Sequence, residues 1–369
     1  MKKELTCSQC GATLSEEELQ VFDGKVLCDT CFIECTIECD NCGTRIWSND
    51  AEGSEDVILC SHCFDYHYTH CHACGLLIHN DNAYYEDDDD DYPYCHNCFH
   101  DIQERPIKNY NYKPEPIFYG SGSLFYGVEL EIDKGGEDES NADALIKLAN
   151  QSSERIYCKH DGSISDGFEI VSHPMNIDYH TNNMNWNALM EKAVSMGYRS
   201  HNTATCGLHI HCSRSAFGED YEKQERAIGR AVYFVERHWQ ELVKFSRRTP
   251  ENLNRWSARY STISDTAEET YSKSKDKRMG RYVALNLENY NTIEFRLFRG
   301  TLRYKTFIAT LQLVDEICLC AINMTDSEIE EMSWLDFVSR ILPKKAELIE
   351  YLKEKRLYVN EPLSEGVES

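Results

Sequence analysis

Acidic and imidazole side chains that could hold metal ions recur in four short stretches of the chain after residue 124. In residues 127–133, Glu129 and Glu131 alternate with apolar residues. The same alternation in 167–172, 206–213 and 292–297 gives the polar side of each stretch these residues: Glu169, His209, His211, Glu294 and Arg296. Two glutamates on one face of a strand repel each other unless a cation lies nearby. Carboxylates and imidazoles in this pattern favour chemistry with a divalent metal ion.

A charged strand face can also be an ordinary solvated surface. Solvated faces usually mix lysine, serine, threonine and glutamate, whereas lysine is absent from all four stretches. We therefore predict a metal-dependent site on the shared polar face.

These side chains must be positioned by a sheet, because alternation of apolar and polar residues has the period of a half-buried β-strand. A fifth strand over 280–288 would form a hairpin with the last stretch through a turn at 289–291. Helical patterns fill the intervals, over 141–151, 185–196, 219–246, 304–323, 333–341 and 344–356. The chain thus predicts an α+β fold with an antiparallel-dominated sheet and flanking helices.

Twelve cysteines before residue 99 form three copies of one spacing pattern. Each copy has two Cys-x2-Cys pairs, and the first pairs begin 32 residues apart. The copies are Cys7, Cys10, Cys28 and Cys31; Cys39, Cys42, Cys60 and Cys63; and Cys71, Cys74, Cys95 and Cys98. Two intervening residues let both thiolates of a pair reach one Zn²⁺, and four thiolates complete its tetrahedral shell. We predict three structural zinc sites with sequential pairing, and Cys35 as a spare thiol.

The three units, at about 5–34, 37–66 and 69–101, resemble tandem LIM-like or zinc-ribbon modules, although the gaps between them exceed the LIM spacing. Residues 102–123, rich in Pro, Tyr and Asn, read as a linker. A catalytic body is expected over 124–325. Short helices and an acidic tail are expected over 326–369.

The charge of the chain narrows its partners. With 38 basic and 63 acidic residues the net charge is −25, and residues 1–105 hold 23 acids against five bases. This balance argues against nucleic acid and against an anionic membrane surface. The acidic zinc modules are expected to dock a protein. The start of the chain lacks the apolar region of a signal peptide, and no run approaches the 18 apolar residues of a membrane span, so we expect a reducing, cytoplasmic setting.

Five motifs resemble, in this order, the amidoligase group of the glutamine synthetase-like carboxylate–amine ligases. They are FYGVELE at 125–131, DGSI at 161–164, EIVSHP at 169–174, GLHIH at 207–211 and EFRLFRGTL at 294–302. The resemblance covers about 124–325 and implies a curved sheet. It also implies a bacterial cell or a phage-infected host. The implied reaction is ATP-dependent formation of an amide or isopeptide bond through an acyl phosphate.

The resemblance also implies roles for individual residues. Five would hold Mg²⁺, namely Glu129, Glu131, Glu169, His209 and Glu294. Arg296 and Arg299 would hold the transferring phosphoryl group, His211 would orient substrate or phosphate, and Asp161 would position or deprotonate the amine. The carboxylate and amine could each belong to a peptide, a protein or an amino acid.

The chain also departs from the glutamine synthetase pattern. The Asp161-Gly162-Ser163 element follows the paired glutamates, whereas in glutamine synthetases such an element precedes them. No Walker-type phosphate loop occurs in the sequence. Two alternatives therefore stay open, a metal-dependent hydrolase or phosphotransferase using the same face, and an adaptor with zinc modules and an inactive ligase body.

Overall fold

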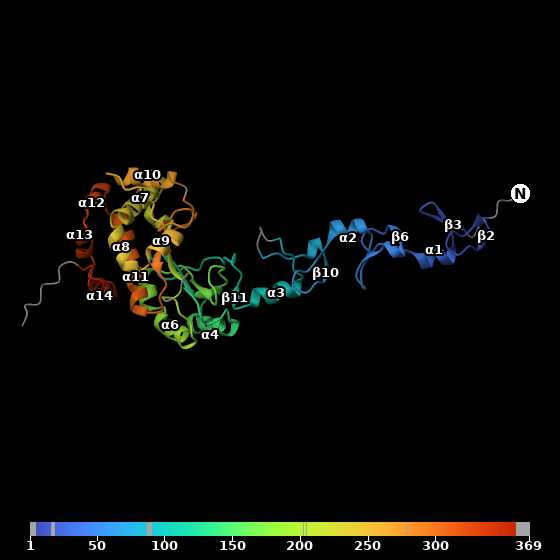
Figure 1. Ribbon diagram of the computed structural model, residues 1–369, viewed down its shortest axis with the longest axis horizontal. Coiled ribbons are helices and arrows are strands. Elements are labelled where there is room, and N and C mark those ends of the chain that lie inside the picture. Colours follow the sequence, from blue (N-terminus) through green and yellow to red (C-terminus); the bar gives the residue numbers. More distant parts are fainter. Residues whose placement is uncertain are drawn as a thin grey trace, which may run out of the picture. The chain divides into compact units, whose positions relative to one another are not determined.

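The computed structural model describes residues 5–15, 19–86, 91–201, 203, 205–277 and 279–358. The chain divides into two compact units, Met1–Glu104 and Arg105–Ser369 (Figure 1). The acidic tail that we predicted after residue 358 lies outside the described residues.

The first unit is built from short antiparallel hairpins and short helices. Its helices are α1 (Asp29–Cys35), α2 (Ser61–His67) and α3 (His96–Glu104). Its strands are β1 (Leu5–Thr6), β2 (Thr13–Leu14), β3 (Leu19–Phe22), β4 (Lys25–Cys28), β5 (Thr36–Glu38), β6 (Arg45–Trp47), β7 (Glu52–Gly53), β8 (Ile58–Leu59), β9 (Tyr68–His70) and β10 (Leu77–His79). Each hydrophobic cluster in it has only three or four fully buried residues, which include cysteines.

The second unit, here called the body, contains a seven-stranded sheet in the order β11-β13-β14-β12-β15-β17-β16. The strands are β11 (Ile107–Lys108), β12 (Tyr126–Ile132), β13 (Ile156–Lys159), β14 (Phe168–Ser172), β15 (Gly207–Ser213), β16 (Leu285–Asn286) and β17 (Thr292–Arg299). Only the β11–β13 pair of this sheet is parallel. The predicted α+β class with an antiparallel-dominated sheet is confirmed.

Helices cover the apolar face of the sheet (Figure 1). The helices of the body are α4 (Glu139–Asn150), α5 (Ile177–Asn182), α6 (Trp186–Ser195), α7 (Tyr221–Arg237), α8 (Trp239–Ser246), α9 (Pro250–Trp256), α10 (Ala267–Asp276), α11 (Tyr304–Asn323), α12 (Asp326–Glu331), α13 (Trp334–Ser339) and α14 (Ala346–Glu354). One core joins strand residues such as Leu130 and Ile210 to helix residues such as Phe307 and Leu311. Each such side chain contributes about 1.5–3 kcal/mol by leaving water. The sheet is thereby left with one face for polar residues.

A buried polar network ties the central strand β12 to the helices behind it. The Tyr126 hydroxyl donates to Oδ1 of Asp315 on α11 at 2.6 Å. Lys345, just before α14, pairs with Asp315 and with Glu316 at 2.6 Å from Oε1. Because each charge has an opposite partner, the network can lie inside the core and fix the strand that carries Glu129.

The long helix predicted over 219–246 is instead two helices. α7 ends at Arg237 and α8 begins at Trp239, because His238 has φ −97° and ψ 28°. The His238 ring is buried against the rings of Phe234 and Trp334, with centroid distances of 4.6 and 5.7 Å. A periodic pattern cannot reveal this break, since no Pro or Gly marks it.

The residues predicted to form a linker, 102–123, are divided between the two units. α3 extends to Glu104, and β11 adds a strand to the edge of the body's sheet. Tyr119 donates its backbone N–H to Pro174 and its hydroxyl to the carbonyl of Glu154. The boundary between the units therefore lies at Glu104–Arg105, ahead of the expected start near residue 124.

Helix α11 is long and apolar enough to cross a membrane, but 83% of its most hydrophobic window is buried inside the body. That burial is typical of the central helix of a folded domain.

Candidate active site and zinc sites

Strand register brings the predicted carboxylates and imidazoles together on the polar face of the sheet. On neighbouring strands Glu129 lies opposite His209, Glu131 opposite Glu169, and His211 opposite Glu294. Residues directly opposite each other in antiparallel strands share a face. Three central strands and β17 thus supply one cluster, which we call the carboxylate–imidazole cluster, made of these six residues.

Contacts within the cluster centre on Glu129. His209 Nδ1 lies 3.3 Å from Glu129 Oε2, and His211 Nε2 lies 3.2 Å from Glu129 Oε1. The same two ring atoms lie 3.7 and 3.9 Å from Glu294 Oε1. His209 Nε2 is 3.8 Å from Glu131 Oε1. Two imidazoles are therefore surrounded by three carboxylates in a largely buried setting.

Two overlapping donor sets in this cluster fit a cation. Ligand atoms of Glu129, Glu169 and His209 lie within 4.8 Å of one another, as do those of Glu129, His211 and Glu294. His211 Nε2 is buried and has no hydrogen-bond partner, while its Nδ1 lies 3.1 Å from the Thr292 hydroxyl. A ring held at one nitrogen with the other directed at carboxylates is the usual arrangement of a metal-ligating histidine.

The acidity of these carboxyl groups reflects the same crowding. Burial and the neighbouring charge of Glu129 hold the pKa of Glu169 well above its usual range. Burial alone would also raise the pKa of Glu129, but the charge of His211 and the hydrogen bond and charge of His209 bring it well below the usual range. A bound cation would relieve the repulsion between these two carboxylates.

Arg296 lies beside the cluster at a β-bulge in β17. Leu208 pairs with Phe298 and Ile210 with Phe295, so two residues of β17 lie opposite His209. Bulges re-aim side chains and are common beside active sites. The Arg296 guanidinium contacts the Glu294 carboxylate, while its buried Nε has no hydrogen-bond partner. It therefore retains a donor for a bound anion.

Arg299 and Asp161 are placed differently from the cluster. Arg299 lies opposite Gly207 and is absent from the lining of the cavity above the cluster. Asp161 does line that cavity, in the loop between β13 and β14. Its Oδ1 accepts the backbone N–H of Ser163 at 2.7 Å, which fixes the loop beside Glu169.

The cavity above the cluster has a volume of about 1050 Å³ and carries cations that the sequence patterns did not reveal. They are Lys113, Lys159, Arg248, Arg255 and Arg281. Lys159 pairs with Glu169 at 3.3 Å. Arg248 is only 7% exposed and forms no ion pair with a described carboxylate. A chain of charge −25 thus gathers basic groups around its acidic cluster.

Aromatic rings also line this cavity. Trp256 at the end of α9 and Tyr282 meet edge to face, with centroids 5.7 Å apart. Arg255 lies over the Trp256 ring at 4.4 Å and Arg281 over the Tyr282 ring at 5.1 Å. Such rings offer a surface on which a flat base could stack.

Each four-cysteine unit in the first part of the chain has zinc-site geometry. Sulfur atoms of Cys10 and Cys28, and of Cys42 and Cys60, lie 3.8 Å apart, and those of Cys74 and Cys95 lie 3.9 Å apart. Thiolates bound at about 2.3 Å in a tetrahedron are about 3.8 Å apart. All twelve cysteines are free of disulfides, and the three predicted groups of four are confirmed as potential metal sites.

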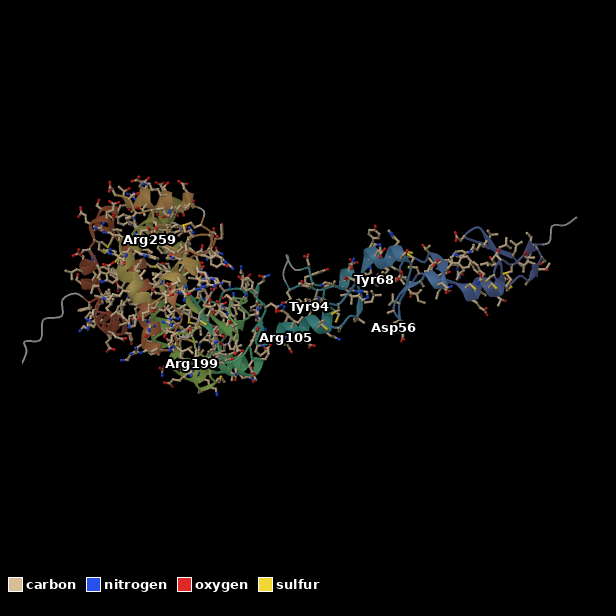
Figure 2. All side chains as sticks on the ribbon, in the orientation of Figure 1. Asp56, Tyr68, Tyr94, Arg105, Arg199 and Arg259 are labelled. Carbon is tan, nitrogen blue, oxygen red and sulfur yellow. The ribbon has the colours of Figure 1, made fainter. Side chains whose placement is uncertain are left out.

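Local backbone structure prepares these sites. Gly11, Gly43 and Gly75 have φ of 78°, 71° and 73°, which allows the turn after each first cysteine pair. Cys28 and Cys60 cap helices α1 and α2, each accepting a backbone N–H at 3.4 Å. In the third unit, Tyr94 is buried in the cluster that contains Cys71 and Cys95 (Figure 2).

Comparison with known families supports the body's identity. Residues 143–318 match a family model described as "putative amidoligase enzyme". The match includes Glu169, His209, His211, Glu294 and Arg296, and begins after β12. The resemblance to amidoligases predicted from the motifs is confirmed for residues 143–318, and the description of that family as an enzyme is consistent with the predicted ligase class. No curated protein matches the chain.

Proposed function

We propose that the body is an ATP- and Mg²⁺-dependent ligase that joins a carboxylate to an amine through an acyl phosphate. One observation carries the proposal: a single cavity combines a floor of carboxylates and imidazoles with guanidinium groups, of which those of Arg248, Arg255 and Arg281 form no ion pair with a described carboxylate. Transfer of a phosphoryl group from a triphosphate requires oxygen ligands for divalent cations and positive side chains that bind the transferred group. The family match supports the ligase class.

The carboxylate–imidazole cluster would hold the magnesium ions. Glu129 belongs to both donor sets, so it would bridge the two positions. When bound, Mg²⁺ would neutralise the phosphates and the substrate carboxylate. Glu131 would position the ligand His209, because its Oε1 lies 3.8 Å from His209 Nε2 while its Oε2 accepts the backbone N–H of Gly207 at 2.5 Å.

Arginine side chains would bind the phosphoryl group. Arg296 already contacts Glu294 and has an unpartnered buried Nε, while Arg248 lies buried without a carboxylate partner. Planar guanidinium groups donate to phosphate oxygens in pairs and stabilise charge that develops during transfer. Trp256 and Tyr282 would receive the adenine base.

The zinc modules would recruit a protein substrate or partner. Their large apolar side chains include Val21, Ile33 and Tyr66, which are 67%, 72% and 68% exposed. Exposed apolar residues on a strongly acidic surface favour docking of a basic protein segment. Free thiolates paired for zinc fit a reducing, cytoplasmic setting.

The test is incubation of the full chain with ATP, Mg²⁺ and pools of amino acids and peptides. We expect ADP, phosphate and a product lighter than the sum of its two parts by one water. Glu129→Gln should abolish both signals, whereas Glu219→Gln, at a 90% exposed side chain outside the cavity, should retain them.

The two rival functions predict other results. A hydrolase or phosphotransferase on the same face would cleave bonds or transfer phosphate without forming a condensed product. An inactive adaptor would form no ADP beyond the level of Glu129→Gln.

A further inference from the structure

A second cavity, of about 1140 Å³, adjoins the first. His211, Glu288 and Asn289 line both cavities, so the two cavities adjoin at the edge of the carboxylate–imidazole cluster. We propose that this second cavity binds the amine substrate, and that this substrate is a primary amine with an apolar or aromatic body of amino-acid to short-peptide size. The inference rests on the proposed ligase function.

Aromatic side chains form part of the wall of the second cavity. Phe118 and Phe125 meet edge to face with centroids 5.0 Å apart, and Phe118 is 55% exposed. Tyr260 and Tyr271 use their hydroxyls inside the protein, donating to the carbonyl of Leu285 and to Oε2 of Glu225. Their hydroxyls are therefore engaged, and the tyrosines contribute mainly ring surface. Such a lining suits an apolar body.

The charge at the junction of the two cavities favours an amine over a carboxylate. Glu225 is matched by Arg214 at 3.0 Å and Lys275 at 2.6 Å, and it accepts the Tyr271 hydroxyl. Glu288 forms no ion pair with a described residue, and it lies where the two cavities meet. An unpaired carboxylate attracts an ammonium group and repels a second carboxylate.

In this arrangement Glu288, in place of Asp161, binds the amine group of the substrate. Asp161 lines only the first cavity, beside Glu169, and accepts the backbone N–H of Ser163. An amine in the second cavity would reach the cluster past His211, which lines both cavities. The size of the cavity also argues against ammonia, which would leave almost all of it unfilled.

The test is calorimetric binding to the full chain with two probes that share a phenyl body, L-phenylalaninamide and 3-phenylpropionate, and with ammonium chloride. We expect phenylalaninamide to bind most tightly. Ser123→Trp places a large side chain at an exposed position of the cavity lining, so it should weaken the binding of phenylalaninamide about tenfold or more. Ser121→Trp, two residues away and outside the lining, should leave it unchanged.

Glu288→Gln should weaken the binding of phenylalaninamide about threefold, whereas the binding of phenylpropionate should stay the same or become tighter because a repelling charge is removed. Tighter binding of phenylpropionate than of phenylalaninamide, or no effect of Ser123→Trp, would overturn the inference. In the turnover assay, a condensed product that incorporates only ammonia would also overturn it while leaving the ligase proposal intact. Absence of any ATP-dependent product would refute the ligase proposal, and the binding data would still decide the second cavity.

Discussion

Replacing Arg248 with methionine should weaken ATP binding and stabilise the free protein. Arg248 is 7% exposed, and its guanidinium donates to the Ser257 hydroxyl at 3.4 Å without any described carboxylate partner. Burial lowers its pKa from 12.5 to about 10. A difference of this size corresponds to about 3 kcal/mol spent on holding the charge in the folded state. Such a cost is understandable if an anion offsets it when the substrate binds.

The two expected effects have opposite signs, which separates a binding role from a structural one. Methionine has a similar length and no charge, so the free energy of unfolding should rise by about 1–3 kcal/mol. Loss of charged donors to phosphate should weaken ATP binding by about 2–4 kcal/mol, or about 30- to 1000-fold.

Urea unfolding followed by tryptophan fluorescence gives the first quantity, and titration calorimetry with Mg²⁺ and ATP gives the second. Arg237→Met, at an exposed arginine outside the cavity, is the matched control and should change neither. The reasoning is refuted if Arg248→Met destabilises the protein while ATP affinity stays the same, because Arg248 would then be a structural residue.

Three further predictions follow from the site and from the first unit. Trp256→Ala should weaken the binding of ATP at least about fivefold and leave the binding of Mg²⁺-tripolyphosphate unchanged, because stacking acts on the base alone. Calorimetry measures both affinities, and equal losses of affinity for the two ligands would contradict a base site at Trp256. Metal analysis should find three zinc ions per chain. Chelation of the zinc should make the first unit sensitive to protease while the body stays intact, since the first unit has only small hydrophobic clusters. A first unit that resists protease after chelation would contradict this prediction. The pKa of Glu169 is raised by burial and by Glu129, so without Mg²⁺ the folded chain keeps a proton on Glu169 that the unfolded chain loses above about pH 4.3. The contribution of Glu169 should therefore lower the free energy of unfolding as pH rises. Glu169→Gln should remove this contribution in urea unfolding, and an unchanged pH dependence would exclude Glu169 as its source.

Local patterns in the sequence were enough to predict the core of the site. Alternation within four stretches identified β12, β14, β15 and β17, and with them the glutamates and histidines of the cluster. The spacing of cysteine pairs likewise identified the zinc units, because their ligands are close in sequence.

The remaining site residues depend on contacts that no local pattern encodes. Lys159 lies on β13, whose four residues are too few to establish a period. Arg248, Arg255 and Arg281 lie in or beside short helices and loops, and only the tertiary fold brings them to one cavity. The bulge at Arg296 arises from pairing between strands, and it shifts the alternation of the residues that follow it in β17. The face on which Arg299 lies could therefore not be predicted from alternation.

The central claim, a carboxylate activated by phosphorylation, is tested most directly by following oxygen. A carboxylate substrate found in the turnover assay would be labelled with ¹⁸O and incubated with the full chain, ATP, Mg²⁺ and its amine. If the reaction passes through an acyl phosphate, one carboxylate oxygen must leave on phosphorus. We therefore predict one ¹⁸O in each inorganic phosphate released. Product formation with unlabelled phosphate would contradict the account.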